Sequence, residues 1–169
     1  MRKIIYFVAT SLDGYIASKD GSVDWLFTEG DYGTQIFMKT IDTILMGRKT
    51  YEQASEFGLG YFTGKKIFVF TKSKKLKAAE GVEIINEDAA PFTRNLIRKK
   101  GKNIWLLGGG KLASSFQNNK LIDEYHLFVH PIILGEGISL FNQLSKISTL
   151  KLKGYKKFGS GLVRINYSK

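Results

Sequence analysis

The stretch Leu106-Leu107-Gly108-Gly109-Gly110-Lys111-Leu112-Ala113 decides how the rest of the chain is interpreted. Its three glycines stand between an apolar, β-prone run at residues 103–107 and a helix-like pattern at residues 111–118. Glycine lets the backbone approach a bulky anion, and a helix start offers free N–H groups and the positive end of a dipole. The stretch therefore predicts a strand–turn–helix unit that binds an anion such as pyrophosphate. The alternative is a tight turn without a ligand.

The same glycines also satisfy a loose dinucleotide fingerprint, in which Gly108, Gly110 and Ala113 hold the three small positions. In a true Rossmann unit an acidic residue ends the next strand, about 20 residues further on. Here Asp123 and Glu124 stand at the start of the next predicted strand, and the turn lies late in the chain. We therefore expect the anion-binding chemistry without a Rossmann unit.

Predicted strands and helices alternate through the first two thirds of the chain, and strands alone finish it. The expected strands are residues 4–9, 43–46, 67–70, 82–85, 103–107 and 124–129, followed by a hairpin of residues 149–158 and 162–167. The expected helices are residues 34–39, 51–57, 111–118 and a helix that begins at the N-cap Asp88 and closes at Gly101.

This order predicts an α/β fold: a three-layer α/β/α domain around a mixed, mostly parallel sheet with an antiparallel C-terminal edge. No repeat and no Pro- or Ser-rich linker divides the chain, so we expect residues 1–169 to form a single domain. Ligands in such sheets bind beyond the carboxyl ends of the strands. The segments of most interest are therefore residues 10–14, 47–50, 71–73 and 108–111.

The composition excludes several kinds of chemistry. The chain has no cysteine, which rules out disulfides, Cys-ligated zinc, iron–sulfur clusters and thiol catalysis, and fits a reducing compartment. His126 and His130 lie on one face of a predicted strand, but four residues span about 13 Å there, too far to share a metal ion. No apolar stretch is long enough for a transmembrane helix. We expect a cytoplasmic protein with no metal and no membrane partner.

The charge balance is strongly basic: 26 Lys and Arg residues against 15 acidic ones give a net charge of +11. Such a charge favours an anionic partner, either a phosphorylated small molecule or a nucleic acid whose bases stack on aromatic side chains. The basic runs are short and scattered, and no known nucleic-acid motif is present. Solvated surface charge is the simpler interpretation of any single run. We expect no nucleic-acid partner, and a basic nucleic-acid-binding protein is the alternative function.

Several segments together resemble a known family. They are Phe7-Val8-Ala9-Thr10-Ser11-Leu12-Asp13-Gly14-Tyr15-Ile16-Ala17, Met46-Gly47-Arg48-Lys49-Thr50-Tyr51-Glu52, Phe70-Thr71-Lys72-Ser73, the glycine stretch, Leu121-Ile122-Asp123-Glu124-Tyr125 and Pro131-Ile132-Ile133-Leu134-Gly135-Glu136-Gly137. Their order and spacing cover nearly the whole chain. The chain resembles the dihydrofolate reductase-like superfamily, and most closely the riboflavin-biosynthesis reductase domain at the C-terminus of the bifunctional deaminase-reductase, with its stand-alone relatives.

The resemblance implies a dihydrofolate reductase-like fold that binds NADPH on these segments. Ala9 and Ile16 would line the nicotinamide, and a helix toward the phosphates would open at Gly47, Arg48, Lys49 and Thr50. The 2′-phosphate would meet Arg48 and the residues Thr71, Lys72 and Ser73, and the pyrophosphate would be wrapped by Gly108, Gly109, Gly110, Lys111 and Leu112. The resemblance also implies a homodimer, which apolar residues of the late strands support: Phe128, Val129, Ile132 and Ile133.

The candidate catalytic residues follow the family pattern less closely. In dihydrofolate reductase proper a carboxylate follows the loop tryptophan by five residues; Trp25 matches the tryptophan, but Gly30 stands at the acid position. We therefore expect poor dihydrofolate reduction. The candidate acids are Asp13, Asp24 and Asp31, and the candidate substrate contacts are Trp25 and Glu136. Asp13 and Trp25 have structural alternatives, a turn-forming Asp and a core or lid aromatic.

The activity that the resemblance implies is hydride transfer from NADPH to a C=N or C=O carbon of a pyrimidine- or pterin-type heterocycle, as in a 5-amino-6-(5-phosphoribosylamino)uracil reductase. Aromatic walls for a planar substrate are expected from Tyr6, Tyr15, Trp25, Phe27 and Phe37. A family member that binds the cofactor without catalysis is the second alternative.

Overall fold

The apolar runs of the sequence form the strands of one eight-stranded sheet in the computed structural model, which describes residues 1–169. The strands are β1 (Ile4–Thr10), β3 (Ile41–Gly47), β4 (Lys66–Phe70), β5 (Val82–Ile85), β6 (Asn103–Gly108), β7 (Glu124–Val129), β9 (Lys151–Lys157) and β10 (Val163–Ser168). Their order across the sheet is β5-β4-β3-β6-β1-β7-β10-β9. Neighbours from β5 to β7 are parallel, and β10 and β9 add an antiparallel edge. Two short strands, β2 (Tyr15–Ala17) and β8 (Ile138–Ser139), pair separately.

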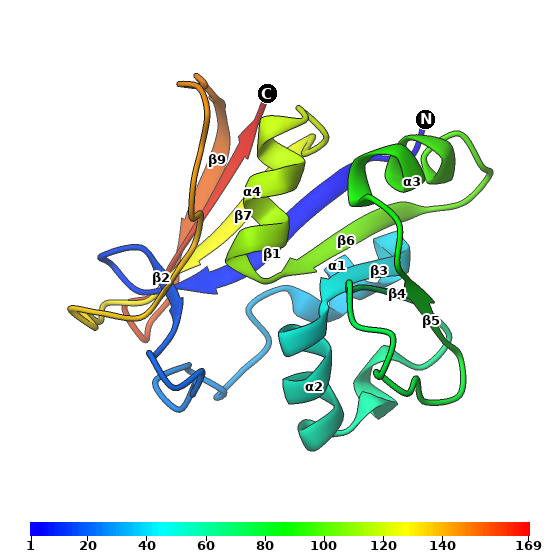
Figure 1. Ribbon diagram of the computed structural model, residues 1–169. Coiled ribbons are helices and arrows are strands. Elements are labelled where there is room, and N and C mark those ends of the chain that lie inside the picture. The colour runs from blue at the N-terminus through cyan, green and yellow to red at the C-terminus, as the bar shows by residue number, and fades with distance from the viewer.

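Helices cover both faces of this sheet (Figure 1). They are α1 (Thr34–Thr40), α2 (Arg48–Phe57), α3 (Ala89–Leu96) and α4 (Gly110–Asn118), with a 3-10 turn η1 (Leu59–Phe62) after α2. Leu96 of α3 and Phe116 of α4 belong to the hydrophobic cluster on one face. Phe37 of α1, Tyr51 of α2 and Phe62 of η1 belong to the cluster on the other face. The three-layer α/β/α fold with a mixed, mostly parallel sheet is therefore confirmed. No helix is both long and apolar enough to span a bilayer.

Three neighbouring strands, β4, β3 and β6, end in register at their carboxyl termini. Gly47, the last residue of β3, pairs with Phe70 at the end of β4, and Met46 pairs with Gly108 at the end of β6. α2 begins directly after β3, and α4 begins two residues after β6. Because the strands are parallel, the residues that follow them gather at the same edge of the sheet.

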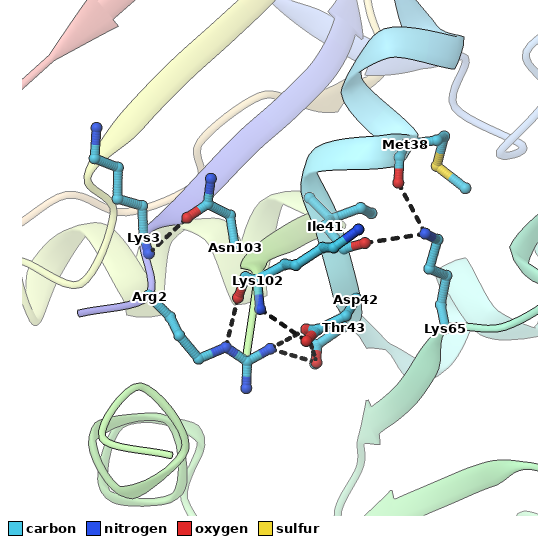
Figure 2. Close-up of polar contacts among 9 residues, drawn as sticks. All are labelled: Arg2, Lys3, Met38, Ile41, Asp42, Thr43, Lys65, Lys102 and Asn103. Carbon is cyan, nitrogen blue, oxygen red and sulfur yellow. Dashed lines mark hydrogen bonds and ion pairs between the residues drawn. The ribbon is translucent and has the colours of Figure 1, made fainter. Parts of the chain in front are cut away.

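Residues at or just before the starts of β1, β3 and β6 meet at the opposite, amino edge (Figure 2). Arg2, whose side chain is buried, contacts the Asp42 carboxylate and donates hydrogen bonds to the Thr43 hydroxyl at 2.6 Å and to the Lys102 carbonyl at 2.6 Å. Burial would raise the pKa of the Asp42 carboxyl, but hydrogen bonds, first that from the Lys102 N–H, and the Arg2 charge lower it instead. Lys65 Nζ donates to two carbonyls at the end of α1. These contacts hold the starts of β1, β3 and β6 together.

Several element boundaries differ from the sequence expectation. α2 begins at Arg48, three residues before the expected start, because it follows β3 without a loop. α3 ends at Leu96, and turns and bends occupy the rest of the stretch to Gly101. Asp88 stands at the N-cap position of α3 but makes no capping hydrogen bond. The pattern does not predict β2 and β8, because strands of three and two residues carry no detectable periodicity.

The position of β7 changes the argument for a dimer. β7 lies between β1 and β10, so it is an interior strand and not an exposed edge. Phe128 of β7 is buried and packs on Phe7, with ring centroids 4.5 Å apart. Phe128 therefore needs no partner chain to cover it. Ile133, in the loop after β7, is exposed.

Candidate functional site

A cavity of about 1600 Å³ opens at the carboxyl edge of the sheet. Its walls include the ends of β1, β3, β4 and β6, the first turns of α2 and α4, and the loop after β2. Pockets for single drug-sized ligands enclose about 300–1,000 Å³. The cavity therefore has room for a large ligand and a second, smaller one side by side.

One end of the cavity is built for anions. The N-termini of α2 and α4 both face it, which brings unpaired N–H groups and two positive dipole ends together. Lys49 on α2, Lys111 on α4 and Lys72 after β4 line this end, and none of them takes part in a salt bridge. Arg48 also lines it, but its guanidinium donates to both carboxylate oxygens of Glu52, at 2.7 and 3.0 Å.

Two features of the turn at residues 108–110 require glycine: the backbone angle of one residue and the close approach of neighbouring segments to the other two. Gly108 has φ +128°, a conformation that other residues rarely adopt, and its peptide bond to Gly109 is cis. A Cβ on Gly109 would lie 3.3 Å from the Thr50 hydroxyl of α2. A Cβ on Gly110 would collide with the Ser139 carbonyl of β8 and lie 2.8 Å from Asn142 Oδ1. Glycine at these positions lets α4 begin directly beside β8 and α2.

The loop after β4 presents Lys72 to the cavity. The Thr71 hydroxyl accepts a hydrogen bond from the Ser73 N–H at 3.0 Å, and Asn86 Nδ2 donates to the Thr71 carbonyl at 2.8 Å. Further along this loop the Tyr51 hydroxyl of α2 accepts a hydrogen bond from the Ala79 N–H at 2.9 Å. Thr71 and Ser73 thus shape the turn, and Lys72 between them lines the cavity.

The other end of the cavity is aromatic. Its floor contains three buried rings, Phe7, Phe62 and Trp105, and Trp105 contacts the other two at centroid distances of 5.7 and 5.9 Å. Its rim contains Phe57, which is 74% exposed, and Tyr61, which is 56% exposed. Exposed large aromatics beside a cavity are typical of a ligand-binding surface.

Most of the residues predicted to bind the cofactor come together around this cavity. Those that line it are Ala9, Ile16, Gly47, Arg48, Lys49, Thr50, Lys72, Gly109, Gly110, Lys111 and Leu112, together with the candidate acid Asp24. Those that do not line it are Thr71, Ser73 and Gly108, the candidate acids Asp13 and Asp31, and the candidate substrate contacts Trp25 and Glu136.

Two of the three candidate acids are engaged in structural hydrogen bonds. Asp13 accepts from the Ser11 hydroxyl at 2.6 Å and from the Gly135 N–H at 2.7 Å, and these bonds, first that from Ser11, lower its pKa. Asp31 accepts three hydrogen bonds from backbone N–H groups of residues 33–35 at the start of α1. Asp24 is exposed and makes no side-chain hydrogen bond. Of the three candidates, only Asp24 is left free to face a ligand.

The two candidate substrate contacts are also occupied elsewhere. Trp25 packs edge-on against His130, with ring centroids 5.3 Å apart, and it does not line the cavity. Glu136 forms an exposed ion pair with Lys19 at 3.0 Å. No three His, Asp or Glu side chains come close enough together to hold a metal ion.

The aromatic end is the part of the site that sequence reasoning missed. Of the five aromatics expected to form it, Tyr6 packs on Phe141 at the opposite face of the sheet, and none of the five lines the cavity. The rings that do line it are Phe7, Phe57, Tyr61, Phe62, Phe70 and Trp105. A local signal existed: Phe57 ends a predicted helix, and Tyr61 and Phe62 follow it among glycines, where no strand or helix periodicity explains them.

Comparison with known proteins agrees with this geometry. A profile of the RibD C-terminal domain family matches residues 2–58 and 61–164. Two relatives from Bacillus subtilis (strain 168) align along almost the whole chain. The uncharacterized protein YwjB is 42% identical over 98% of this chain and 97% of its own length. The uncharacterized protein YyaP is 35% identical over 98% of this chain and 94% of its own length.

Solved structures share the fold. A protein from Shewanella sp. PV-4, provisionally named as a riboflavin biosynthesis protein, superposes with a TM-score of 0.86 at 28% identity, over 99% of this chain and 98% of that one. The diaminohydroxyphosphoribosylaminopyrimidine deaminase/5-amino-6-(5-phosphoribosylamino)uracil reductase of Thermotoga maritima has a TM-score of 0.75 at 18% identity, over 99% of this chain and 56% of that one. Dihydrofolate reductase from Enterococcus faecalis, complexed with NADP(H), has a TM-score of 0.71 at 18% identity, over 98% and 95%.

The dihydrofolate reductase-like fold is thus shared with enzymes of low sequence identity, and closer sequence similarity narrows the assignment. The profile match covers most of the chain, and two relatives exceed 30% identity along almost its whole length. The chain belongs to the RibD C-terminal domain family.

Proposed function

We propose that this protein is an NADPH-dependent reductase that transfers a hydride to a planar heterocycle of the pyrimidine or pterin type. Family membership and the riboflavin-biosynthesis reductases among its structural neighbours support a reductase-like activity. The observation that carries the proposal is the positively charged, anion-binding end of the cavity. Two helix N-termini and three unpaired lysines face one space there, beside a glycine turn with no room for a side chain.

The residues present fit a phosphorylated dinucleotide. The N–H groups that open α4, after Gly109 and Gly110, would donate to the pyrophosphate. Lys72 stands two residues after β4 and Arg48 is the first residue of α2, directly after β3, where each would reach a 2′-phosphate. Ala9 and Ile16, both small or aliphatic, would form the wall against which the nicotinamide lies.

When bound, NADPH supplies the hydride. The chain's own contribution is to hold the ring of the substrate against this wall and to exclude water from the space between them. The buried rings Phe7 and Trp105 form a flat, apolar floor for this purpose. Asp24 would deliver the proton that the reduced ring takes up, because it is the candidate carboxylate that lines the cavity without a partner.

The proposal is tested by titrating NADPH and NADH into the protein and following tryptophan fluorescence, with Trp105 in the cavity floor as the reporter. We expect NADPH to bind markedly more tightly than NADH. Oxidation of NADPH is then measured by its absorbance in the presence of aminopyrimidines, pterins and dihydrofolate, the last being a poor substrate.

Failure of both cofactors to bind would contradict the proposal. If the protein instead bound oligonucleotides with a steep dependence on salt, the basic nucleic-acid-binding alternative would be favoured. Tight NADPH binding without turnover of any heterocycle would favour the alternative of a cofactor-binding protein without catalysis.

A further inference from the structure

The two ends of the cavity differ sharply in charge. The cations without a carboxylate partner, Lys49, Lys72 and Lys111, all lie at the end where the strands β4, β3 and β6 stop. The other two cations of the lining are neutralised: Arg48 by Glu52 and Lys19 by Glu136. A phosphate in the cavity therefore meets free positive charge at one end only.

The aromatic end has an acidic rim. Glu52 and Glu56 lie one turn apart on α2, beside Phe57, and Asp20 and Asp24 line the cavity from the loop after β2. This loop is held against α2 by a hydrogen bond from Gln53 Nε2 to the Gly21 carbonyl at 2.8 Å, so the acids of the loop and the helix share one opening.

Asp31 does not line the cavity, but its charge acts on Tyr61 of the rim. Burial and the nearby charge of Asp31 raise the pKa of the Tyr61 hydroxyl, which therefore remains a neutral phenol at physiological pH. The aromatic end thus combines ring faces with negative charge. Both favour a ligand that is neutral or positive, because ring faces carry a negative quadrupole and repel anions as carboxylates do.

The floor of this end offers a ligand flat apolar rings and few hydrogen-bonding groups. The indole Nε1 of Trp105 already donates to the Phe7 carbonyl at 2.9 Å, so it has no hydrogen left for a ligand. Phe7 and Phe62 carry no polar atom in their side chains. The floor therefore selects for a flat ring by contact and stacking.

We propose that the substrate held at the aromatic end is a planar aromatic compound without a phosphate group, neutral or positively charged. This inference rests on the proposed function, since the cofactor takes the positively charged, anion-binding end of the cavity. The phosphates of the cofactor saturate the only part of the cavity that attracts them. A phosphorylated substrate would place its phosphate against Glu56 and Asp24, neither of which has a cationic partner.

Riboflavin and flavin mononucleotide test this inference, because they share one fluorescent ring and differ by a single phosphate. Each is titrated into protein saturated with NADP+, and quenching of flavin fluorescence gives the dissociation constant. We expect riboflavin to bind at least about tenfold more tightly than flavin mononucleotide at low salt, and the difference to shrink as salt screens the carboxylates.

Three variants assign the effect to residues. Phe57→Ala, at an exposed position that does not threaten folding, should weaken riboflavin several-fold by removing part of the rim. Glu56→Lys should bring the two dissociation constants to within about threefold, because it replaces repulsion by attraction. Glu83→Lys makes the same charge change on β5, outside the cavity, and should leave the ratio as in the wild type.

Flavin mononucleotide binding as tightly as riboflavin, or neither flavin binding at millimolar concentration, would overturn the inference. So would an equal response to Glu56→Lys and Glu83→Lys. Saturation with NADP+ is followed separately by tryptophan fluorescence, so that loss of cofactor binding counts against the proposed function alone. The flavin ratio and its response to Glu56→Lys then still decide the inference.

Discussion

At the scale of single residues, Arg48 has two possible partners. In the structure its guanidinium is paired with Glu52 on the next turn of α2, and both side chains are about half exposed. Such an i,i+4 pair contributes only about 0.2–0.5 kcal/mol. A phosphate would offer Arg48 a stronger, doubly charged partner in the same cavity. The ion pair therefore does not exclude a role in cofactor selection.

Arg48→Ala should weaken NADPH binding roughly 10- to 100-fold and hardly change NADH binding, because hydrogen bonds to a charged group contribute about 1.5–3 kcal/mol. Fluorescence titration of both cofactors measures the effect. Glu52→Gln is the matched control: it frees Arg48 from its partner and should leave NADPH binding equal or tighter. Equal losses for the two cofactors in Arg48→Ala would remove Arg48 from the 2′-phosphate site.

Gly110 is a second single residue on which the shape of the cavity depends. A methyl group there would collide with the Ser139 carbonyl of β8, so Gly110→Ala must push α4 and β8 apart. We expect a loss of about 1–3 kcal/mol in the free energy of unfolding, as for other overpacked sites, together with weaker NADPH binding. Urea denaturation measures the first effect. Gly159→Ala, at a position where the added methyl meets nothing within 4 Å, should change neither quantity.

At the scale of elements, the segment around Trp25 and Phe27 packs against His130, the residue that follows β7. The His130 ring is 5.3 Å from the Trp25 ring and 5.0 Å from the Phe27 ring, and the residue is 2% exposed. Burial lowers the pKa of His130, although its hydrogen bond to the Phe128 carbonyl opposes this. The folded protein therefore keeps His130 neutral.

This predicts that the protein loses stability in mild acid. Because the unfolded chain binds a proton at His130 at higher pH than the folded chain does, the free energy of unfolding should fall as the pH drops below about 6.5. Burial lowers the pKa of His126 as well, so His130→Asn should reduce this pH dependence without abolishing it. Urea denaturation at several pH values measures it. An unchanged slope in His130→Asn would show that another group titrates.

The elements that the sequence predicts well are those whose signal is local. β1 and β6 are continuous apolar runs because both faces of each strand are covered, and the glycine turn marks the start of α4 by itself. β2 and β8 depend instead on a contact between distant segments, in which Gly137 lies directly against the Ala17 carbonyl. No local pattern carries that information.

The same distinction separates the two ends of the site. The anion-binding end was predictable because its glycines and cations each follow a strand directly in the sequence. The aromatic end requires Trp105 of β6 to meet Phe62 of η1 across the fold. Alternation along a strand then decides which ring is used: Phe7 faces the cavity, whereas its neighbour Tyr6 points to the opposite face.

At the scale of the whole molecule, we propose that two copies of the chain pair through the outer face of β7 and β10. Val129 pairs with Val163 and Leu127 with Ile165, and these four half-buried residues belong to neither hydrophobic cluster. Tyr155 of β9, beside Ile165, is 75% exposed. Lysines along β9 disfavour pairing through the strand edge itself, so contact between faces is the expected mode.

Light scattering should therefore give twice the 19.0 kDa mass of one chain. Ile165→Asp places a charge in the centre of the apolar face and should shift the mass to that of the monomer. Ile36→Asp makes the same change at an exposed position of α1 and should leave the dimer intact. A wild-type mass near 19.0 kDa would remove the dimer.

The hydrogen bond from the Ala79 N–H to the Tyr51 hydroxyl makes the Ala79 amide a reporter of loop motion in hydrogen exchange. The Tyr51 ring, on α2, is buried in a hydrophobic cluster of the sheet and cannot follow a moving loop, so the bond breaks whenever the loop that carries Lys72 moves away from the helix. The Ala79 amide can exchange its hydrogen for deuterium only during those excursions. Its exchange rate therefore reports how often the loop between β4 and β5 moves away from α2, beside the cavity that Lys72 lines.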